Sequence, residues 1–190
     1  MGGSIMANNI NAITSGVGGV SVTGDTSGAF AFQKDGTTVA SISDTGVISS
    51  NVPAFNATLS ANQSVTSGVA TKVAFDTIEY DANSNFNTST SIFTPTIAGY
   101  YQVNLAVRCQ GASNPSVWLA FIYKNGSYVS FSGTQAASSN TTQYAQTSSI
   151  VYMNGTTDYL EAYGYIVATT PSFVTNVATT YFQACLIRAE

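Results

Sequence analysis

The sequence predicts an all-β protein, a β-sandwich or jelly roll with a short β-segment and an extended arm before it. Apolar and polar residues alternate in short runs, and turn residues such as Gly, Asn and Asp separate these runs. No stretch shows a helical period. Aromatic residues make up 12% of the 190 residues, including 11 Tyr and 10 Phe, which favours strands and a dense core.

The chain carries little charge. It is 44% hydrophobic but only 7% charged, with a formal net charge of -4, whereas an average globular chain is about 25% charged. The five basic residues are scattered, which argues against a nucleic-acid surface. No apolar run is long enough for membrane insertion, and the first residues lack the features of a secretory signal. We therefore expect synthesis in a cytoplasm. We also expect the chain to be part of an assembly that faces the outside medium, because a free cytoplasmic monomer normally relies on surface charge for solubility.

The N-terminal part divides into an arm and a small β-segment. Residues 1–20 are rich in Gly, Asn, Ser and Ala, which predicts an extended anchoring arm held by a partner. Residues 21–52 predict strands at 29–33, 38–43 and 46–49, with glycine turns between them. Three strands this short bury too little to stand alone, and trimerisation would give them a shared core. This segment resembles the proximal segments of bacteriophage fibre and head-decoration proteins.

Residues 53–190 predict the main domain, because Pro53 interrupts strand pairing and a steady series of strands follows it. Asn125-Gly126 and Asn154-Gly155 each lie between two predicted strands and favour type I′ hairpins. The expected strands lie near residues 54–59, 69–74, 100–110, 116–124, 128–133, 143–153, 158–167 and 180–187.

Six residues in this domain have a characteristic spacing: Phe75, Asp81, Phe86, Phe93, Gly99 and Tyr101. With this spacing, the domain resembles the jelly-roll head of the C1q/tumour-necrosis-factor family. Val103 and Leu105 depart from the family's usual aromatics but stay apolar and in phase with Tyr101. The resemblance implies a homotrimer in which the sheet carrying strand 100–110 and the last strand faces the threefold axis. Alternation places one set of side chains on the core side of that strand: Tyr101, Val103, Leu105, Val107 and Cys109.

Catalysis is not expected. The chain has no histidine, which removes the usual general base and the histidine metal sites, and it has no phosphate-binding glycine motif. Carboxylates that are close in sequence could form a glycosidase pair, but they are more simply read as turn and surface residues. These carboxylates are Asp76, Glu79 and Asp81, and separately Asp158 and Glu161. Cys109 and Cys185 are interpreted as two small buried residues, with a disulfide between them as the alternative.

We expect no cofactor, with one alternative. Residues 81–85, Asp-Ala-Asn-Ser-Asn, resemble the start of a calcium loop because oxygen ligands occupy alternate positions. Phe86 replaces the glycine of an EF-hand and Ile92 its final glutamate, so this loop is not an EF-hand. A Ca²⁺ ion bound by this loop through some other arrangement therefore remains the alternative.

Three polar loops, at residues 111–115, 133–142 and 169–177, are candidate recognition surfaces, and aromatic and amide side chains suit saccharides. The alternative is that these loops only cap the sandwich. The candidate contact residues are Asn114, Tyr128, Asn140, Tyr144, Phe173 and Asn176.

The leading hypothesis is a bacteriophage virion structural protein on the particle surface. It would be a trimeric capsid decoration (cement) protein or short head fibre that docks on the major capsid protein, or another virion protein, through residues 1–50. The alternatives are a tail-fibre protein that recognises host surface glycans and a C1q-like adhesion module.

Overall fold

The structure is a computed structural model that describes residues 30–34, 37–43, 48–50, 52–135 and 141–190. The chain divides into two units, residues 1–50 and residues 51–190, and each unit is described by itself. The arm predicted for residues 1–20 lies outside the described residues, and the three-part domain assignment stays a prediction. No helix among the described residues is long and apolar enough to cross a membrane.

The first unit contains a three-stranded antiparallel sheet in the order β1-β2-β3. Its strands are β1 (Phe30–Lys34), β2 (Thr37–Ile42) and β3 (Ile48–Ser50). Phe32 pairs with Ala40, and Ile42 pairs with Ile48. Three short strands are therefore confirmed, with bounds that differ from the expected ones by one or two residues, and residues 29, 46 and 47 of the expected strands lie outside the described residues. Phe32 is 52% exposed, so this sheet leaves a large aromatic side chain in solvent.

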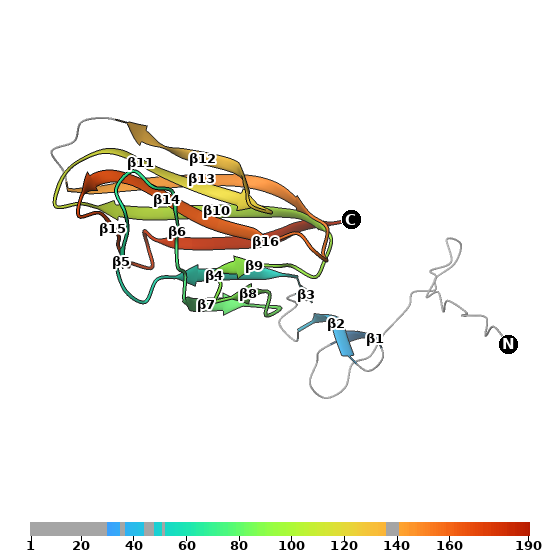
Figure 1. Ribbon diagram of the computed structural model, residues 1–190. Helices are drawn as coiled ribbons and strands as arrows, with labels where there is room; N and C mark the ends of the chain where they lie inside the picture. The colour runs from blue at the N-terminus through green and yellow to red at the C-terminus, as the bar shows by residue number, and fades with distance from the viewer. Residues whose placement is uncertain (1–29, 35–36, 44–47, 51, 136–140) are drawn as a thin grey trace, which may run out of the picture. The chain divides into compact units, whose positions relative to one another are not determined.

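The second unit is a sandwich of two antiparallel sheets (Figure 1). The first sheet has the order β5-β15-β10-β16-β4-β7, and β13 lies on the other side of β10. Its strands are β4 (Ala54–Thr58), β5 (Gln63–Ser64), β7 (Thr77–Asp81), β10 (Gly99–Gln110), β13 (Thr142–Met153), β15 (Ser172–Phe173) and β16 (Tyr181–Ala189). Ala54 of β4 pairs with Cys185 of β16, so the start and the end of this unit lie at the same end of the sandwich.

The second sheet has the order β12-β11-β14-β9-β8, and β6 also pairs with β14. Its strands are β6 (Thr71–Lys72), β8 (Phe86–Asn87), β9 (Ile92–Phe93), β11 (Ser113–Lys124), β12 (Ser127–Gln135) and β14 (Leu160–Thr169). The all-β sandwich predicted from the sequence is confirmed.

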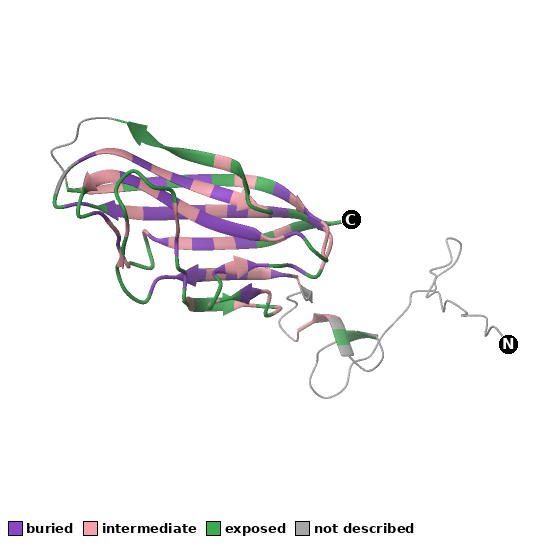
Figure 2. Ribbon diagram, viewed as in Figure 1, coloured by how far each residue is buried: buried purple, intermediate pink, exposed green. Residues whose placement is uncertain are grey.

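The core lies between the two sheets, and buried positions alternate along the strands (Figure 2). Tyr101, Val103 and Leu105 of β10 are all buried, as their phase predicted. Phe55 is fully buried at the centre of an aromatic cluster. Its ring centroid lies 4.4 Å from Phe93, 4.8 Å from Phe86 and 5.1 Å from Phe182. Rings that stack and meet edge to face at these distances add to the stability that burial provides.

The turn between β11 and β12 is as predicted. Asn125 has φ of 52° and Gly126 has φ of 79°, and positive φ at both positions is the requirement of a type I′ hairpin.

The prediction for Asn154-Gly155 was wrong, because β13 belongs to the first sheet and β14 to the second. This turn crosses between the sheets. Asn154 Oδ1 stabilises it by accepting the backbone N–H groups of Thr156, Thr157 and Asp158 at 2.9–3.0 Å.

The predicted strand at 69–74 was also too long, because only Thr71–Lys72 pairs with β14. The strand β7, which the sequence analysis did not expect, pairs with β4 at the edge of the first sheet.

Candidate binding surfaces

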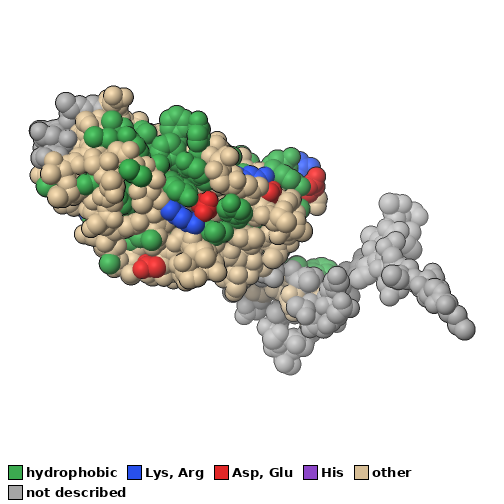
Figure 3. Space-filling view, in the orientation of Figure 1, with side chains coloured by type: hydrophobic (Ala, Val, Ile, Leu, Met, Phe, Trp, Pro, Cys, Tyr) green, Lys and Arg blue, Asp and Glu red, His purple; other side chains and the backbone are tan. Residues whose placement is uncertain are grey.

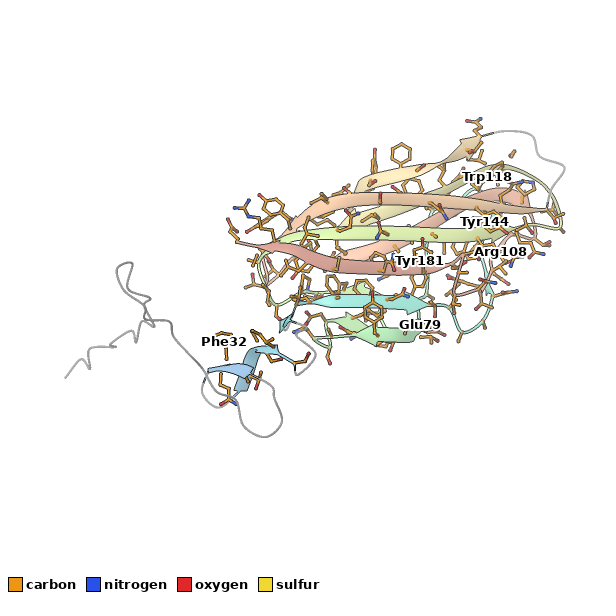
Figure 4. The ribbon with its side chains drawn as sticks, turned by 180° about the vertical axis from the view of Figure 1, so that it is seen from behind. Phe32, Glu79, Arg108, Trp118, Tyr144 and Tyr181 are labelled. Atoms are coloured by element: carbon orange, nitrogen blue, oxygen red, sulfur yellow. The ribbon has the colours of Figure 1, made fainter. Side chains whose placement is uncertain are left out.

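The first candidate surface is the outer side of the sheet formed by β4, β7, β10, β13 and β16, here called the β10 face. Alternation turns the even-numbered residues of β10 to this side, away from the core. The register aligns a row of amides across the strands, from Asn56 through Gln183 to Asn104. Arg108 pairs with Tyr144 further along, and both side chains lie on this side with Tyr181 (Figure 4).

Large apolar groups are exposed on the β10 face. Tyr100 is 45% exposed, Tyr144 53% and Ile150 58%. Two polar atoms of this face, Asn56 Oδ1 and Arg108 Nε, are buried without a hydrogen-bond partner among the described residues. Buried polar atoms are normally paired in native proteins. A surface that combines exposed apolar groups with unpaired polar atoms is therefore suited to bind another protein chain, which would cover the first and pair with the second.

The second candidate surface is an aromatic cluster on the outer side of β11, β12 and β14, here called the aromatic face. It is formed by Phe121, Tyr123, Tyr128, Phe131 and Tyr163, and their ring centroids lie 4.3–6.2 Å apart in contacting pairs. Tyr128 and Phe131 are 59% and 55% exposed. Figure 3 shows hydrophobic side chains gathered over these strands. An exposed patch of this kind commonly marks a binding surface.

Two ion pairs lie close to the aromatic face. Lys72 Nζ contacts Glu161 Oε1 at 2.7 Å, and Lys124 Nζ contacts Asp158 Oδ2 at 2.8 Å. Hydrogen bonds from Lys124 and Asn125 hold the pKa of Asp158 below its usual value. A glycosidase acid needs a raised pKa. Asp158 and Glu161 are therefore each held in an ion pair with a lysine, and its lowered pKa does not suit Asp158 to the role of the acid.

The predicted recognition residues do not form one site. Tyr128 lies on the aromatic face, and Tyr144 lies on the β10 face of the other sheet. The expectation that Phe173 is exposed was wrong: β15 pairs with β10 and turns this ring into the core, where it contacts Gly164 and is fully buried.

The remaining candidates are asparagines. Asn176 is exposed, but its Oδ1 accepts the Ala178 N–H at 2.9 Å and so stabilises a turn. Asn114 lies in β11 and its side chain is outside the described part, as is the whole of Asn140.

Of the aromatic face, only Tyr128 was among the predicted contact residues. Phe121, Tyr123 and Tyr163 were not predicted because they lie within strands, whereas the predicted contact residues lie in or near loops. The alternation of aromatic residues at 121 and 123 was the available signal.

The two cysteines are unpaired and lie in different environments. Cys109 is fully buried on β10, and burial raises the pKa of its thiol to about 12. The interpretation of Cys185 as buried was wrong, because alternation along β16 turns it outward onto the β10 face, opposite Gln102.

The signature residues have structural roles. Phe75, Phe86, Phe93 and Tyr101 belong to the core. Asp81 Oδ2 accepts the Phe86 N–H at 2.8 Å, which closes the loop between β7 and β8.

Comparison with known proteins agrees with this architecture. Residues 54–179 match the family described as C1q domain. The globular domain of zebrafish complement 1qA protein is similar in structure, with a TM-score of 0.53 and 16% identity over 73% of this chain and 99% of that chain. Eiger TNF from S. frugiperda has a TM-score of 0.51 and 10% identity over 73% of this chain and 93% of that chain. Murine APRIL has a TM-score of 0.53 and 9% identity over 72% of this chain and 99% of that chain. No curated protein sequence matches the chain. The family match covers more than half of the residues, so the chain belongs to the C1q domain family.

Proposed function

We propose that the chain is a homotrimeric structural protein of a bacteriophage virion, a capsid decoration protein or short head fibre with a projecting C1q-type head. Three copies is the number that the family resemblance implies. The β10 face supports self-association, because burial against other copies would cover its tyrosines and Ile150 and give partners to Asn56 Oδ1 and Arg108 Nε.

The observation that carries the proposal is the division into two unlike units. A C1q head is joined to a three-stranded sheet that is too small to be stable alone and that exposes Phe32 (Figure 4). A sheet of this kind needs either its own copies or a docking partner. Residues 1–50 are therefore proposed to bind the major capsid protein or another virion protein.

Self-association is tested with the full chain by sedimentation velocity and native mass spectrometry. The expected mass is three times the 19.7 kDa of one chain. Ile150→Glu should give monomers, since a charge would be buried in the contact without a partner. Val177→Glu is the matched control, because Val177 is 62% exposed and lies outside the β10 face. A wild-type monomer, or equal effects of both substitutions, would refute the trimer.

The virion role is tested by cryo-electron microscopy of the native particle. Density for this chain on the icosahedral shell supports decoration, and density at the tail end refutes it. Failure of the purified chain to bind capsids that lack it would also refute it.

A second function, recognition of host surface glycans, is favoured by the aromatic face. Exposed rings can stack on sugar rings, and the tyrosine hydroxyls can bond to sugar hydroxyls. Tyr128→Ala and Phe131→Ala should each abolish binding of the full chain to host cells. If binding persists in both variants, the aromatic face is not the receptor surface.

A further inference from the structure

We infer that Glu79 of one copy forms an ion pair with Arg108 of the next copy, so that every contact of the trimer contains this pair. The inference rests on the proposed trimer and names a contact within it. Arg108 lies on β10, in the middle of the first sheet, and Glu79 lies on β7, at the edge of that sheet (Figure 4).

The surroundings of Arg108 lack an acceptor. Arg108 Nε and Thr179 Oγ1 are both buried without a hydrogen-bond partner among the described residues. The turn that carries Thr179 is held against Arg108, because the Arg108 N–H donates to Thr180 Oγ1 at 3.1 Å and the Val174 N–H donates to the Arg108 carbonyl at 2.9 Å. A guanidinium and a hydroxyl can both donate hydrogen bonds, and a carboxylate has two oxygens to accept them. The missing partner is therefore best supplied by a carboxylate.

Glu79 is the carboxylate that the head leaves available. It makes none of the ion pairs or hydrogen bonds found among the described residues, and its side chain is exposed. Each of the other described side-chain carboxylates already has a partner: Asp158 and Glu161 have lysines, Asp76 has Ser60, Asp81 has the Phe86 N–H, and Glu190 has the Tyr152 hydroxyl.

Glu79 and Arg108 are too far apart to pair within one copy. The strands β16 and β4 lie between β10 and β7. Three strand spacings of about 4.8 Å separate the two backbones by about 14 Å, and the outward side chains of β16 and β4 occupy the space between them. A ring of three copies is built from contacts between unlike surfaces, in which one part of a copy meets a different part of the next. An edge strand that meets the middle of the neighbouring sheet satisfies this requirement.

Apolar side chains flank both members of the pair. Ile78 and Tyr80, on either side of Glu79, are 42% and 50% exposed, and Tyr144, which is opposite Arg108 in the register, is 53% exposed. Burial of these groups in the contact would remove water from around the two charges. A charge that loses water without gaining a partner is strongly unfavourable, so the loss of either member should weaken the contact greatly.

The test is charge exchange in the full chain, measured by sedimentation velocity and native mass spectrometry. Arg108→Glu and Glu79→Arg should each give monomers, because each substitution brings two like charges together in the contact. The variant with both substitutions should form trimers again, since the pair is restored with its signs reversed. Glu79→Arg combined with Arg188→Glu is the matched control, because it has the same net charge but reverses an exposed arginine at the other end of the sheet, opposite Tyr100. This control should remain monomeric.

If Arg108→Glu does not fold, as judged by circular dichroism, the milder substitutions Glu79→Gln and Thr179→Val are used instead. Glu79→Gln should raise the dissociation constant of the trimer at least tenfold. Adding Thr179→Val should raise it by less than the product of the two separate effects, because both side chains act on the same contact.

A wild-type monomer would refute the proposed trimer itself. The pair alone is overturned, and the trimer is left standing, if the wild type is trimeric and Glu79→Arg remains so. The same conclusion follows if both single variants fold as monomers and the double exchange fails to restore the trimer.

Discussion

Gly99 begins β10 opposite the end of β16, and replacing it with alanine should destabilise the head strongly. A Cβ at this position would overlap the Arg188 carbonyl oxygen and would lie 2.8 Å from Leu186 Cδ1 and 2.9 Å from Ala189 Cα. Its φ of 154° adds a backbone penalty of about 1–3 kcal/mol for a residue with a side chain. Relief of the overlap requires the end of β16 to move away, with the loss of one or two ladder hydrogen bonds of about 1 kcal/mol each. We expect a loss of about 3–5 kcal/mol of unfolding free energy.

Gly68→Ala separates the two contributions. Gly68 also has a positive φ, of 76°, but the nearest atom to its added Cβ is Tyr165 Oη at 3.8 Å. This variant should lose only the left-handed backbone penalty, about 1–2 kcal/mol. Both are measured by guanidinium unfolding at one fixed protein concentration, because assembly raises apparent stability by mass action. If Gly99→Ala loses no more stability than Gly68→Ala, the overlap with β16 is not the reason for the glycine.

Three further predictions concern titration and exposure. In the folded chain, the bonds to Lys124 and Asn125 lower the pKa of Asp158 below its ordinary value of 3.8. The stability that this carboxylate contributes is therefore present above pH 3.8 and is lost as the pH falls through the lower pKa of the folded state. Asp158→Asn should be less stable at pH 7 and lose less stability on acidification, as read from guanidinium midpoints. Burial raises the pKa of Tyr101 to about 12, so stability should fall between pH 10 and 12, and Tyr101→Phe should reduce this slope. Cys185 is exposed in the single chain, and a trimer formed through the β10 face would bury it. Maleimide should therefore label Cys185 rapidly in the Ile150→Glu variant and slowly in the wild type. Equal rates would contradict the burial of Cys185 between copies.

Much of the sandwich could be predicted because its long strands carry a period-2 pattern over ten or more residues. The phase of Tyr101, Val103 and Leu105 places all three in the core, as observed. Short elements were harder, because β5, β6, β8, β9 and β15 contain two residues each and leave no period to detect.

The candidate surfaces were predicted less well, because each depends on which strands pair. Phe173 follows a polar loop in the sequence, and only its pairing with Cys109 on β10 explains its burial. Asn154-Gly155 has the composition of a hairpin turn, but no local feature indicates that its flanking strands belong to different sheets. The alternating oxygen-bearing side chains of residues 81–85 are visible in the sequence, but only the structure shows that Asp81 Oδ1 and Asn85 Oδ1 are buried with no donor in the described part of the chain.

The antiparallel pairing of β4 with β16 matters for any use of this head as a display scaffold. Leu186 N–H donates to the Pro53 carbonyl at 2.9 Å, so a peptide fused after Glu190, four residues further along, would leave the sandwich at the end where residue 52 enters it. The link between β10 and β11, at Gly111 and Ala112, lies at the opposite end of the sandwich, because Gln110 is eleven positions along β10 from Gly99. Cargo inserted there would lie at the end of the sandwich opposite residue 52, whereas a C-terminal fusion would lie at the same end as residue 52.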